Sequence, residues 1–224
     1  MKQKTVMALF TGAALVDPVK KLSAQVLPDV RFINVLDDSL IADVIAAGRM
    51  TPAVLGRIHQ YCRIGAEMGA DLIWETCSSV GVSVDYLQPF FDIPVLRIDR
   101  PMAEAAVEQG SRIAVLATLP TTLEPTMELV RQVAREKGKE IRVVNGLAEG
   151  AFQALTDGDP ETHDRLLLET ARRAAGNSDV ILLAQGSMAR MELPLRDATG
   201  IPVFSSIRPG LEALKPYLFG EGKA

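Results

Sequence analysis

The sequence is poor in the residues that build disulfide frameworks, metal centres and membrane spans. Only two cysteines and two histidines occur among its 224 residues. Neither Cys62 nor Cys77 has a partner at a metal-ligand spacing, and two cysteines make no disulfide framework. The apolar runs are short and interrupted, so no segment is long enough to span a bilayer. These absences argue against a disulfide scaffold, a metal site and an integral membrane protein.

The chain also lacks an excess of positive charge. Its net charge is −4 and its pI is near 5.3, so we expect no binding to nucleic acid or to an anionic membrane. Hydrophobic residues make up 48% and charged residues 23%, which are globular values. A chain of this length can bury a sizeable core in one large or two compact domains. Small molecules or other protein chains are the expected partners.

The N-terminal segment is similar to a signal peptide, but we interpret it as part of the fold. Lys2 and Lys4 precede the apolar run Val6–Phe10, as in a secretory leader. Removing this segment would delete a predicted strand whose counterpart is Arg112–Ala117 in the repeat described next. The sequence therefore predicts a cytoplasmic protein that keeps this segment.

Two stretches of the chain are similar to each other. Asp71-Leu-Ile-Trp-Glu-Thr-Cys-Ser-Ser-Val-Gly81 corresponds to Asn177-Ser-Asp-Val-Ile-Leu-Leu-Ala-Gln-Gly-Ser-Met188, with Asp71 matching Asp179 at an offset of 108 residues. Cys77 then falls on Gln185. Further pairs at nearly the same offset are Pro94-Val95 with Pro202-Val203, Arg100-Pro101 with Arg208-Pro209, Thr11 with Thr118, and Asp17-Pro18 with Glu124-Pro125. Several matches in one order indicate an internal duplication.

Apolar runs alternate with helical periodicity throughout both halves. The expected strands are Thr5–Phe10, Val30–Val35, Leu72–Thr76, Pro94–Ile98, Arg112–Ala117, Ile141–Asn145, Val180–Ala184 and Pro202–Phe204. The expected helices cover residues 16–27, two segments within 39–69, 122–137, two segments within 147–176, and 209–218. Thr51 and Pro52 are typical of a helix start.

This alternation predicts an α/β fold made of two similar lobes. Each lobe is expected to be a parallel sheet flanked by helices, with a pseudo-twofold axis relating the lobes and the site between them. The first lobe would comprise residues 1–98 and 206–224 and carry Cys77. The second would comprise residues 99–205 and carry Thr118 and Gln185–Ser187.

Cys77 is the strongest candidate for chemistry. It follows a predicted buried strand and precedes two small hydroxyl residues, Ser78 and Ser79. The carboxyl end of a parallel strand is where ligands bind in such sheets. A thiol at a helix N-terminus would have a lowered pKa and could act as a base. The alternative is that Cys77 is a small buried apolar residue, as free cysteines often are.

Three further turns carry small polar residues after predicted strands. Candidate substrate-binding residues at these turns are Thr11, Thr118, Thr121, Thr122, Gln185, Gly186 and Ser187. Hydroxyls and backbone amides in such turns bind carboxylate or phosphate. The alternatives are a plain helix N-cap by Thr121 or Thr122 and ordinary turn residues at Gly186 and Ser187. His59 and His163 lie in amphipathic helices and are interpreted as structural.

Three motifs together resemble the aspartate/glutamate/hydantoin racemase superfamily over nearly the whole chain. They are Thr76-Cys-Ser-Ser79, Arg112-Ile-Ala-Val-Leu-Ala-Thr118 with Thr121-Thr122 behind it, and Gln185-Gly-Ser187. The resemblance implies two α/β lobes, a homodimer, and removal and return of a proton beside a carboxylate or carbonyl without a cofactor. It also implies that Cys77 is one of two facing cysteines, and that the hydroxyl and amide groups around it hold a small carboxylate substrate.

The second cysteine of that pattern is missing. Ala184-Gln-Gly-Ser187 stands where the family has Gly-Cys-Thr, Cys62 lies too far upstream, and Gln185 can neither give nor take a proton. Three reactions remain open: isomerisation or tautomerisation on one face, protonation after decarboxylation or elimination, and covalent addition to a double bond. We favour isomerase-type chemistry. The rival from another class is a non-catalytic carboxylate-binding protein.

Overall fold

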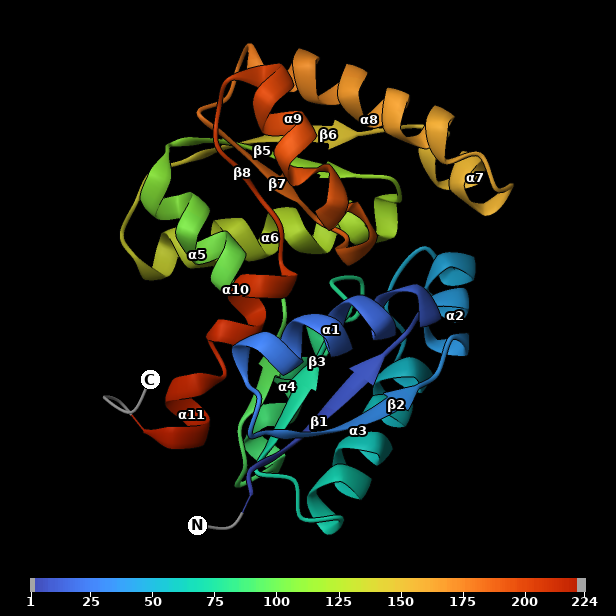
Figure 1. Cartoon of the computed structure of the whole chain (residues 1–224), viewed down its shortest axis with the longest axis vertical. Helices are drawn as coiled ribbons and strands as arrows, with labels where there is room; N and C mark the ends of the chain where they lie inside the picture. The colour runs from blue at the N-terminus through green and yellow to red at the C-terminus, as the bar shows by residue number, and fades with distance from the viewer. Residues whose placement is uncertain (1–2, 221–224) are drawn as a thin grey trace. The chain divides into compact units, whose positions relative to one another are not determined.

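The computed structural model describes residues 3–220, so residues 1–2 and 221–224 of the predicted first lobe lie outside it. The chain forms two compact units (Figure 1). The first contains the residues up to Ile98 and those from Ile207 onward, and the second is Asp99–Ser206. Ser206, which the predicted division gives to the first lobe, clusters with the second unit.

The first unit is built on a sheet of four parallel strands in the order β2-β1-β3-β4. The strands are β1 (Thr5–Phe10), β2 (Arg31–Leu36), β3 (Leu72–Glu75) and β4 (Val95–Arg97). The helices are η1 (Ala13–Leu15), α1 (Val16–Val26), α2 (Ser39–Ala47), α3 (Pro52–Glu67), α4 (Ser83–Leu87), η2 (Gln88–Phe90), α10 (Ile207–Glu212) and α11 (Lys215–Phe219). Every residue of β1 and β3 is buried, as expected for the two central strands of a parallel sheet.

The second unit repeats this plan with a parallel sheet in the order β6-β5-β7-β8. The strands are β5 (Arg112–Ala117), β6 (Arg142–Leu147), β7 (Val180–Leu183) and β8 (Val203–Phe204). The helices are α5 (Arg100–Gln109), α6 (Pro120–Glu136), α7 (Ala151–Thr156), α8 (Pro160–Ala175), η3 (Gly186–Met191) and α9 (Glu192–Thr199). Parallel sheets with helices in both units confirm the predicted fold class.

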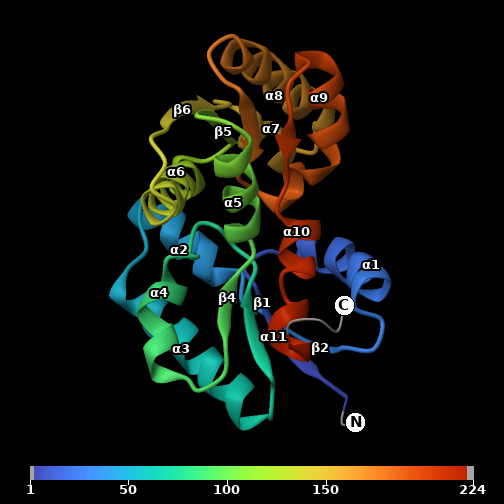
Figure 2. The same cartoon turned by 90° about the vertical axis from the view of Figure 1, so that its left-hand side faces the viewer.

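Helices cover both faces of the second sheet. One face of β5 and β7 packs with α5 and α6 around Val115 and Leu182. The opposite face packs with α8 and α9 around Leu116 and Leu183 (Figure 2). In the first unit α2 and α3 cover the face that carries Met7 and Leu9. Alternate residues along each central strand thus enter different cores, so side-chain direction follows directly from sequence position.

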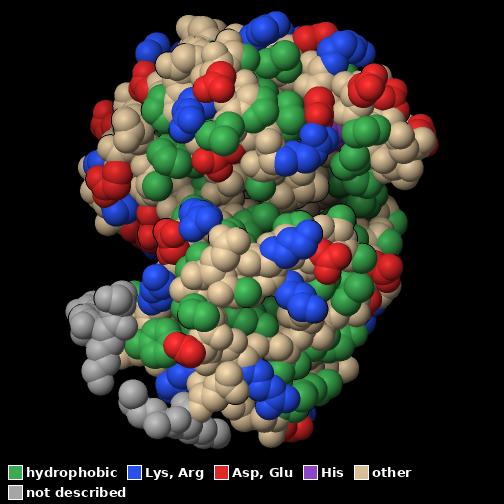
Figure 3. Space-filling view, in the orientation of Figure 1, with side chains coloured by type: hydrophobic (Ala, Val, Ile, Leu, Met, Phe, Trp, Pro, Cys, Tyr) green, Lys and Arg blue, Asp and Glu red, His purple; other side chains and the backbone are tan. Residues whose placement is uncertain are grey.

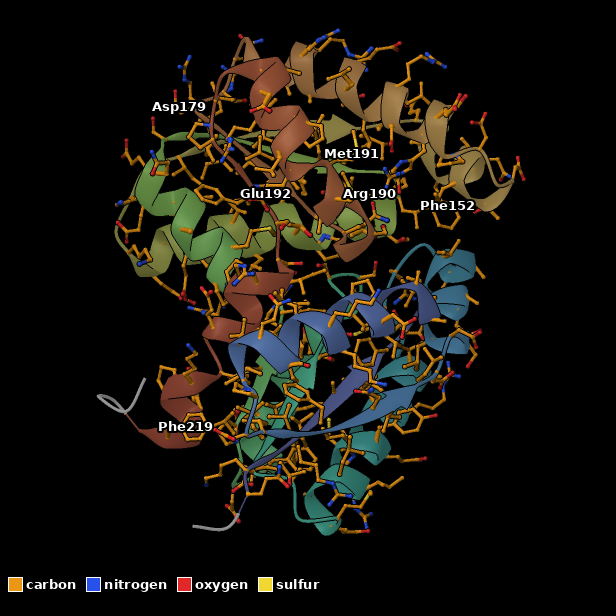
Figure 4. The ribbon with its side chains drawn as sticks, in the orientation of Figure 1. Phe152, Asp179, Arg190, Met191, Glu192 and Phe219 are labelled. Carbon is orange, nitrogen blue, oxygen red and sulfur yellow. The ribbon has the colours of Figure 1, made fainter. Side chains whose placement is uncertain are left out.

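The duplication reappears in the hydrogen bonds that fix the strands. The Asp71 carboxylate accepts the Thr5 N–H at 2.9 Å, and its counterpart Asp179 accepts the Arg112 N–H at 2.9 Å. Each aspartate also pairs with a cation: Lys4 Nζ lies 2.8 Å from Asp71, and the Arg112 guanidinium contacts Asp179 (the latter labelled in Figure 4). In each unit, the aspartate just before the third strand therefore holds the first residue of the first strand.

Several element boundaries differ from the prediction. The segment 209–218 is not one helix but belongs to α10 and α11, because Pro216 cannot supply an N–H to continue a helix. Leu147 ends strand β6 instead of starting a helix, since it pairs with Ala117. Helix α6 begins at Pro120, before the predicted Thr122. Helices α4, α5 and α9 were not predicted.

Within residues 3–220, no helix is long and apolar enough to cross a membrane. On the face drawn in Figure 3, Lys and Arg side chains are interspersed with Asp and Glu side chains. This mixed surface agrees with the small net charge of the chain.

Candidate functional site

Cys77 lies just beyond the carboxyl end of β3, beside the end of β1. The adjacent Thr76 Oγ1 donates to the Leu9 carbonyl at 2.7 Å and fastens the two strand ends together. After Cys77 the chain makes successive tight turns, in which the Val80 N–H donates to the Cys77 carbonyl at 3.1 Å. Helix α4 begins only at Ser83. Cys77 therefore stands at the head of a turn, and the expectation of a helix N-terminus at this residue is wrong.

Three donors converge on the Cys77 sulfur. They are the hydroxyl of Thr11 and the backbone N–H groups of Ser79 and Val80. These donors favour the thiolate, but burial and then the Glu75 carboxylate outweigh them and raise the pKa of Cys77 to about 11. The lowered pKa expected from the sequence is therefore corrected: the half-buried sulfur is a thiol at neutral pH.

Two buried charged residues lie beneath this turn, and sequence reasoning missed both. Glu75 is 2% exposed, and its Oε1 accepts the Cys77 N–H at 2.8 Å. Arg97 is 6% exposed and pairs in register with Glu75 across β3 and β4. A charged residue inside an otherwise apolar strand was the available signal, because such residues are rarely buried unless paired.

The second unit places Gln185 where the first has Cys77. The Gln185 Oε1 accepts both the Thr118 N–H at 2.7 Å and the Thr118 hydroxyl at 2.9 Å. This repeats the contact between Thr11 and Cys77. Because a backbone N–H can only donate, the facing atom is the amide oxygen, and the Gln185 nitrogen keeps its two N–H donors. Gly186 begins η3, and Ser187 is exposed.

The first turn of α6 carries two further candidates, Thr121 and Thr122. The N-cap is Leu119, which makes no side-chain cap bond, so the alternative of a threonine N-cap is wrong. The Thr121 hydroxyl is buried and has no hydrogen-bond partner among residues 3–220. A buried hydroxyl at the start of a long helix, where N–H groups also point outward, suits an anion.

The two units thus have similar turns after their third strands, one carrying a thiol and the other an amide. The profile of the Asp/Glu/Hydantoin racemase family matches residues 5–214. The chain belongs to this family. No protein of the curated set matches it in sequence.

Solved structures resemble this racemase-family chain at low sequence identity. Glutamate racemase from Francisella tularensis in complex with D-glutamate is 14% identical, with a TM-score of 0.75, covering 98% of this chain and 82% of that one. Picrophilus torridus aspartate racemase is 17% identical, with a TM-score of 0.71 and coverages of 97% and 99%. Unliganded arylmalonate decarboxylase is 16% identical, with a TM-score of 0.60 and coverages of 99% and 95%. At such identities these likenesses show the fold.

This racemase-family chain has one more polar cluster next to the Gln185 turn. Arg190, labelled in Figure 4, lies in the last turn of η3 and pairs with Asp164 through both terminal guanidinium nitrogens, at 2.5 Å each. His163 is buried, and its Nδ1 lies 2.8 Å from Asp164. Burial acts to raise the pKa of Asp164, but Arg190 and His163 outweigh it and lower that pKa. The cluster ties η3 to the start of α8.

The structure gives both histidines structural contacts. His59 packs against Phe90 and Phe91, with ring centroids 5.8 and 5.6 Å away. Among residues 3–220 no three His, Cys, Asp or Glu side chains are grouped so that they could hold a metal ion.

Proposed function

We propose that this protein is a cofactor-independent isomerase- or racemase-type enzyme. It would move a proton next to a carboxylate or carbonyl of a small organic acid, with Cys77 as the catalytic residue. Family membership supports the reaction class. The homodimer and the cytoplasmic location stay predictions from the sequence.

The observation that carries the proposal is the set of donors on the Cys77 sulfur. The Thr11 hydroxyl and the N–H groups of Ser79 and Val80 stabilise a negative sulfur. A purely structural cysteine has no need of them, whereas a thiol that loses and regains a proton does. Their position at the carboxyl end of β3 is where ligands bind in parallel sheets.

The proposed chemistry has two half-steps. In one, the Cys77 thiol first loses its proton to water, and the resulting thiolate removes a proton from the carbon next to the carboxylate as the electron pair of the broken C–H bond passes into an enolate. In the other, the thiol gives its proton to an enolate carbon and becomes a thiolate. Return of the proton to a different carbon gives an isomer. Oriented N–H and O–H donors stabilise the enolate as its charge develops.

We further propose that the polar turns of both units bind the anionic substrate. Candidate donors are the hydroxyls of Thr11, Ser78, Ser79, Thr118, Thr121, Thr122 and Ser187, the amide nitrogen of Gln185 and the backbone of Gly186. The Thr121 hydroxyl and the Gln185 nitrogen are supported best, since neither donor is used in a hydrogen bond within residues 3–220. The D-glutamate complex of the Francisella tularensis racemase supports a small carboxylate as the ligand class.

A second candidate is a one-thiol decarboxylase or lyase. It is favoured by the raised pKa of Cys77, because a resting thiol can deliver a proton without first ionising. In a decarboxylation the C–C bond breaks, its electron pair stays on carbon, carbon dioxide leaves, and the thiol protonates that carbon. Solvent then reprotonates the sulfur. Gln185 in place of a second thiol fits a reaction that needs only one proton donor.

The test is carbon-bound hydrogen exchange in deuterated water, followed by NMR, with a panel of small mono- and dicarboxylates. The wild type should incorporate deuterium into at least one acid, or release carbon dioxide from a malonate-type acid. Cys77→Ala should slow that reaction by at least about 100-fold, the usual contribution of an acid–base group. Cys62→Ser is the matched control and should retain activity.

The result would also separate the catalytic from the non-catalytic hypothesis. If Cys77→Ala turned over a substrate as fast as the wild type, Cys77 would not be the catalytic residue. If no acid reacted but dicarboxylates protected Cys77 from alkylation, the protein would be the carboxylate-binding alternative.

A further inference from the structure

The duplication allows each residue near Cys77 to be compared with its counterpart in the other unit. At the offset of 108 residues, Glu75 corresponds to Leu183 and Arg97 to Ser205. Leu183 lies in the apolar core, so the scaffold does not require a charge at this strand position. Only the unit that carries the thiol has a buried carboxylate and a buried guanidinium at these two positions.

The turn that follows Cys77 also differs between the units, at Gly81. Gly81 corresponds to Ala189 at the same offset. A methyl group on Gly81 would come within 2.7 Å of an Arg97 guanidinium nitrogen. Arg97 as it lies leaves no room for a methyl group at 81, whereas the small Ser205 accompanies alanine at 189. Two linked differences between the units indicate that the Arg97 guanidinium is fitted against the turn.

Glu75 and Arg97 contact the two ends of the Cys77 turn. Glu75 Oε1 holds the Cys77 N–H at 2.8 Å, and Arg97 packs against Gly81. Register partners on parallel strands project to the same face, so the two side chains are neighbours. Burial of an ionised carboxylate is costly unless a cation compensates it, and Arg97 is placed to do so.

We propose that Glu75 and Arg97 are positioning residues for Cys77. Together they hold the turn from beneath, and Glu75 places a fixed negative charge beside the sulfur, so that Cys77 rests as a proton donor. The inference rests on the proposed function, because it assigns the resting state of the proposed catalytic thiol. It adds two residues to the functional site that lie on strands instead of in the turn.

The first test is the pH dependence of Cys77 alkylation in a Cys62→Ser background. Glu75→Gln keeps an oxygen that can accept the Cys77 N–H but removes the charge. The alkylation midpoint should fall from near 11 by about one pH unit or more. Asp85→Asn removes an exposed carboxylate on α4 and should leave the midpoint unchanged. An unchanged midpoint in folded Glu75→Gln would overturn the proposal.

Other titratable or charged groups on this face stay constant in the comparison. They include Arg97 on β4, Tyr61 and Cys62 on α3, Asp37 after β2, which accepts the Tyr61 hydroxyl at 2.9 Å, and Arg57, whose guanidinium lies 3.7 Å from Asp37. Cys62 is removed in every sample, so only Cys77 reports.

A mutant cycle between Gly81 and Arg97 tests the fit against the turn. Gly81→Ala and Arg97→Ser should each lower the urea midpoint of unfolding, and the double variant, which copies Ala189 and Ser205, should lose less than the two combined. Additive losses would contradict the fit. If Glu75→Gln does not fold, this cycle still tests the part of the proposal that concerns Arg97, and additive losses would remove Arg97 from it.

The alkylation test needs no substrate, so it separates this inference from the proposed function. A lower midpoint in Glu75→Gln, in a protein whose turnover does not need Cys77, would refute the proposed function alone. An unchanged midpoint in a protein that does need Cys77 would refute the role of Glu75 alone.

Discussion

At the scale of the residue, Cys77 and Gln185 occupy equivalent positions in the two units but differ in the chemistry of their side chains. Each receives a hydrogen bond from the threonine that follows the first strand of its unit, Thr11 or Thr118. The thiol can exchange a proton, whereas the amide can only orient or polarise. The asymmetry therefore lies in the side-chain chemistry of one position, while the local geometry is shared.

Replacing Thr121 should have different effects on stability and on the binding of carboxylates. Its buried hydroxyl has no partner within residues 3–220, so Thr121→Val should leave stability unchanged or raise it by up to about 1 kcal/mol. The same change should weaken protection by small carboxylates, because it removes a proposed donor. Urea unfolding with and without ligand measures both effects.

A control for this prediction lies in the same helix. The buried Thr126 hydroxyl donates to the Thr122 carbonyl at 2.9 Å, so Thr126→Val should lower stability by up to about 1 kcal/mol and leave carboxylate protection unchanged. Equal ligand protection in Thr121→Val and the wild type would remove Thr121 from the binding residues.

At the scale of the element, two glycines should respond oppositely to a single added methyl group. Gly146 lies in the edge strand β6, and a Cβ there would come within 2.7 Å of the Val115 carbonyl oxygen. Because backbone cannot move aside cheaply, Gly146→Ala should cost about 1–3 kcal/mol of stability. Urea unfolding checks the value, and a neutral result would show that β6 shifts freely.

Gly56 is the matched control. It is exposed within α3, and an added Cβ would have no atom within 4 Å. Alanine favours helix over glycine, so Gly56→Ala should raise stability by up to about 1 kcal/mol. The two substitutions are chemically identical, and only the element and its surroundings differ.

The sequence predicted elements well where periodicity and turn residues agreed. β1 and β5 have the predicted bounds, and Thr51 caps α3 by accepting the Val54 N–H at 3.3 Å. Helix α5 was missed although its buried residues Met102, Ala103, Ala106 and Val107 have helical spacing. Two of these are alanines, whose small side chains give a weak apolar signal.

At the scale of the whole molecule, the duplication was readable from sequence and the thiol environment was not. The repeat is written in short matching segments, and the same strand orders and aspartate contacts recur in both units. The pKa of Cys77 depends instead on how deeply the sulfur and Glu75 are buried. Burial is a property of packing, so the expected helix N-terminus and the hydroxyls of Ser78 and Ser79 predicted the wrong direction for the pKa of Cys77.

The hydrogen bonds of Asp179 lead to a prediction about stability at acid pH. Hydrogen bonds from Arg112 and Ser111 lower the pKa of Asp179 to about 2, well below the roughly 3.9 of an unfolded aspartate. A group with a lowered folded pKa stabilises the native state above its unfolded pKa and loses that contribution as the pH falls toward its folded pKa. Stability should therefore decline between about pH 4 and pH 2.

Asp179→Asn isolates this contribution. The variant cannot lose a proton, so its unfolding free energy should be lower than that of the wild type at pH 7, and the gap should narrow as the pH falls toward 2. Asp85→Asn changes an exposed carboxylate and should leave the difference from wild type small at both pH values. Urea unfolding at pH 7 and near pH 3 gives the comparison. A gap that stayed constant with pH would mean that Asp179 supports β5 through its shape and neutral hydrogen bonds, and that its charge contributes nothing.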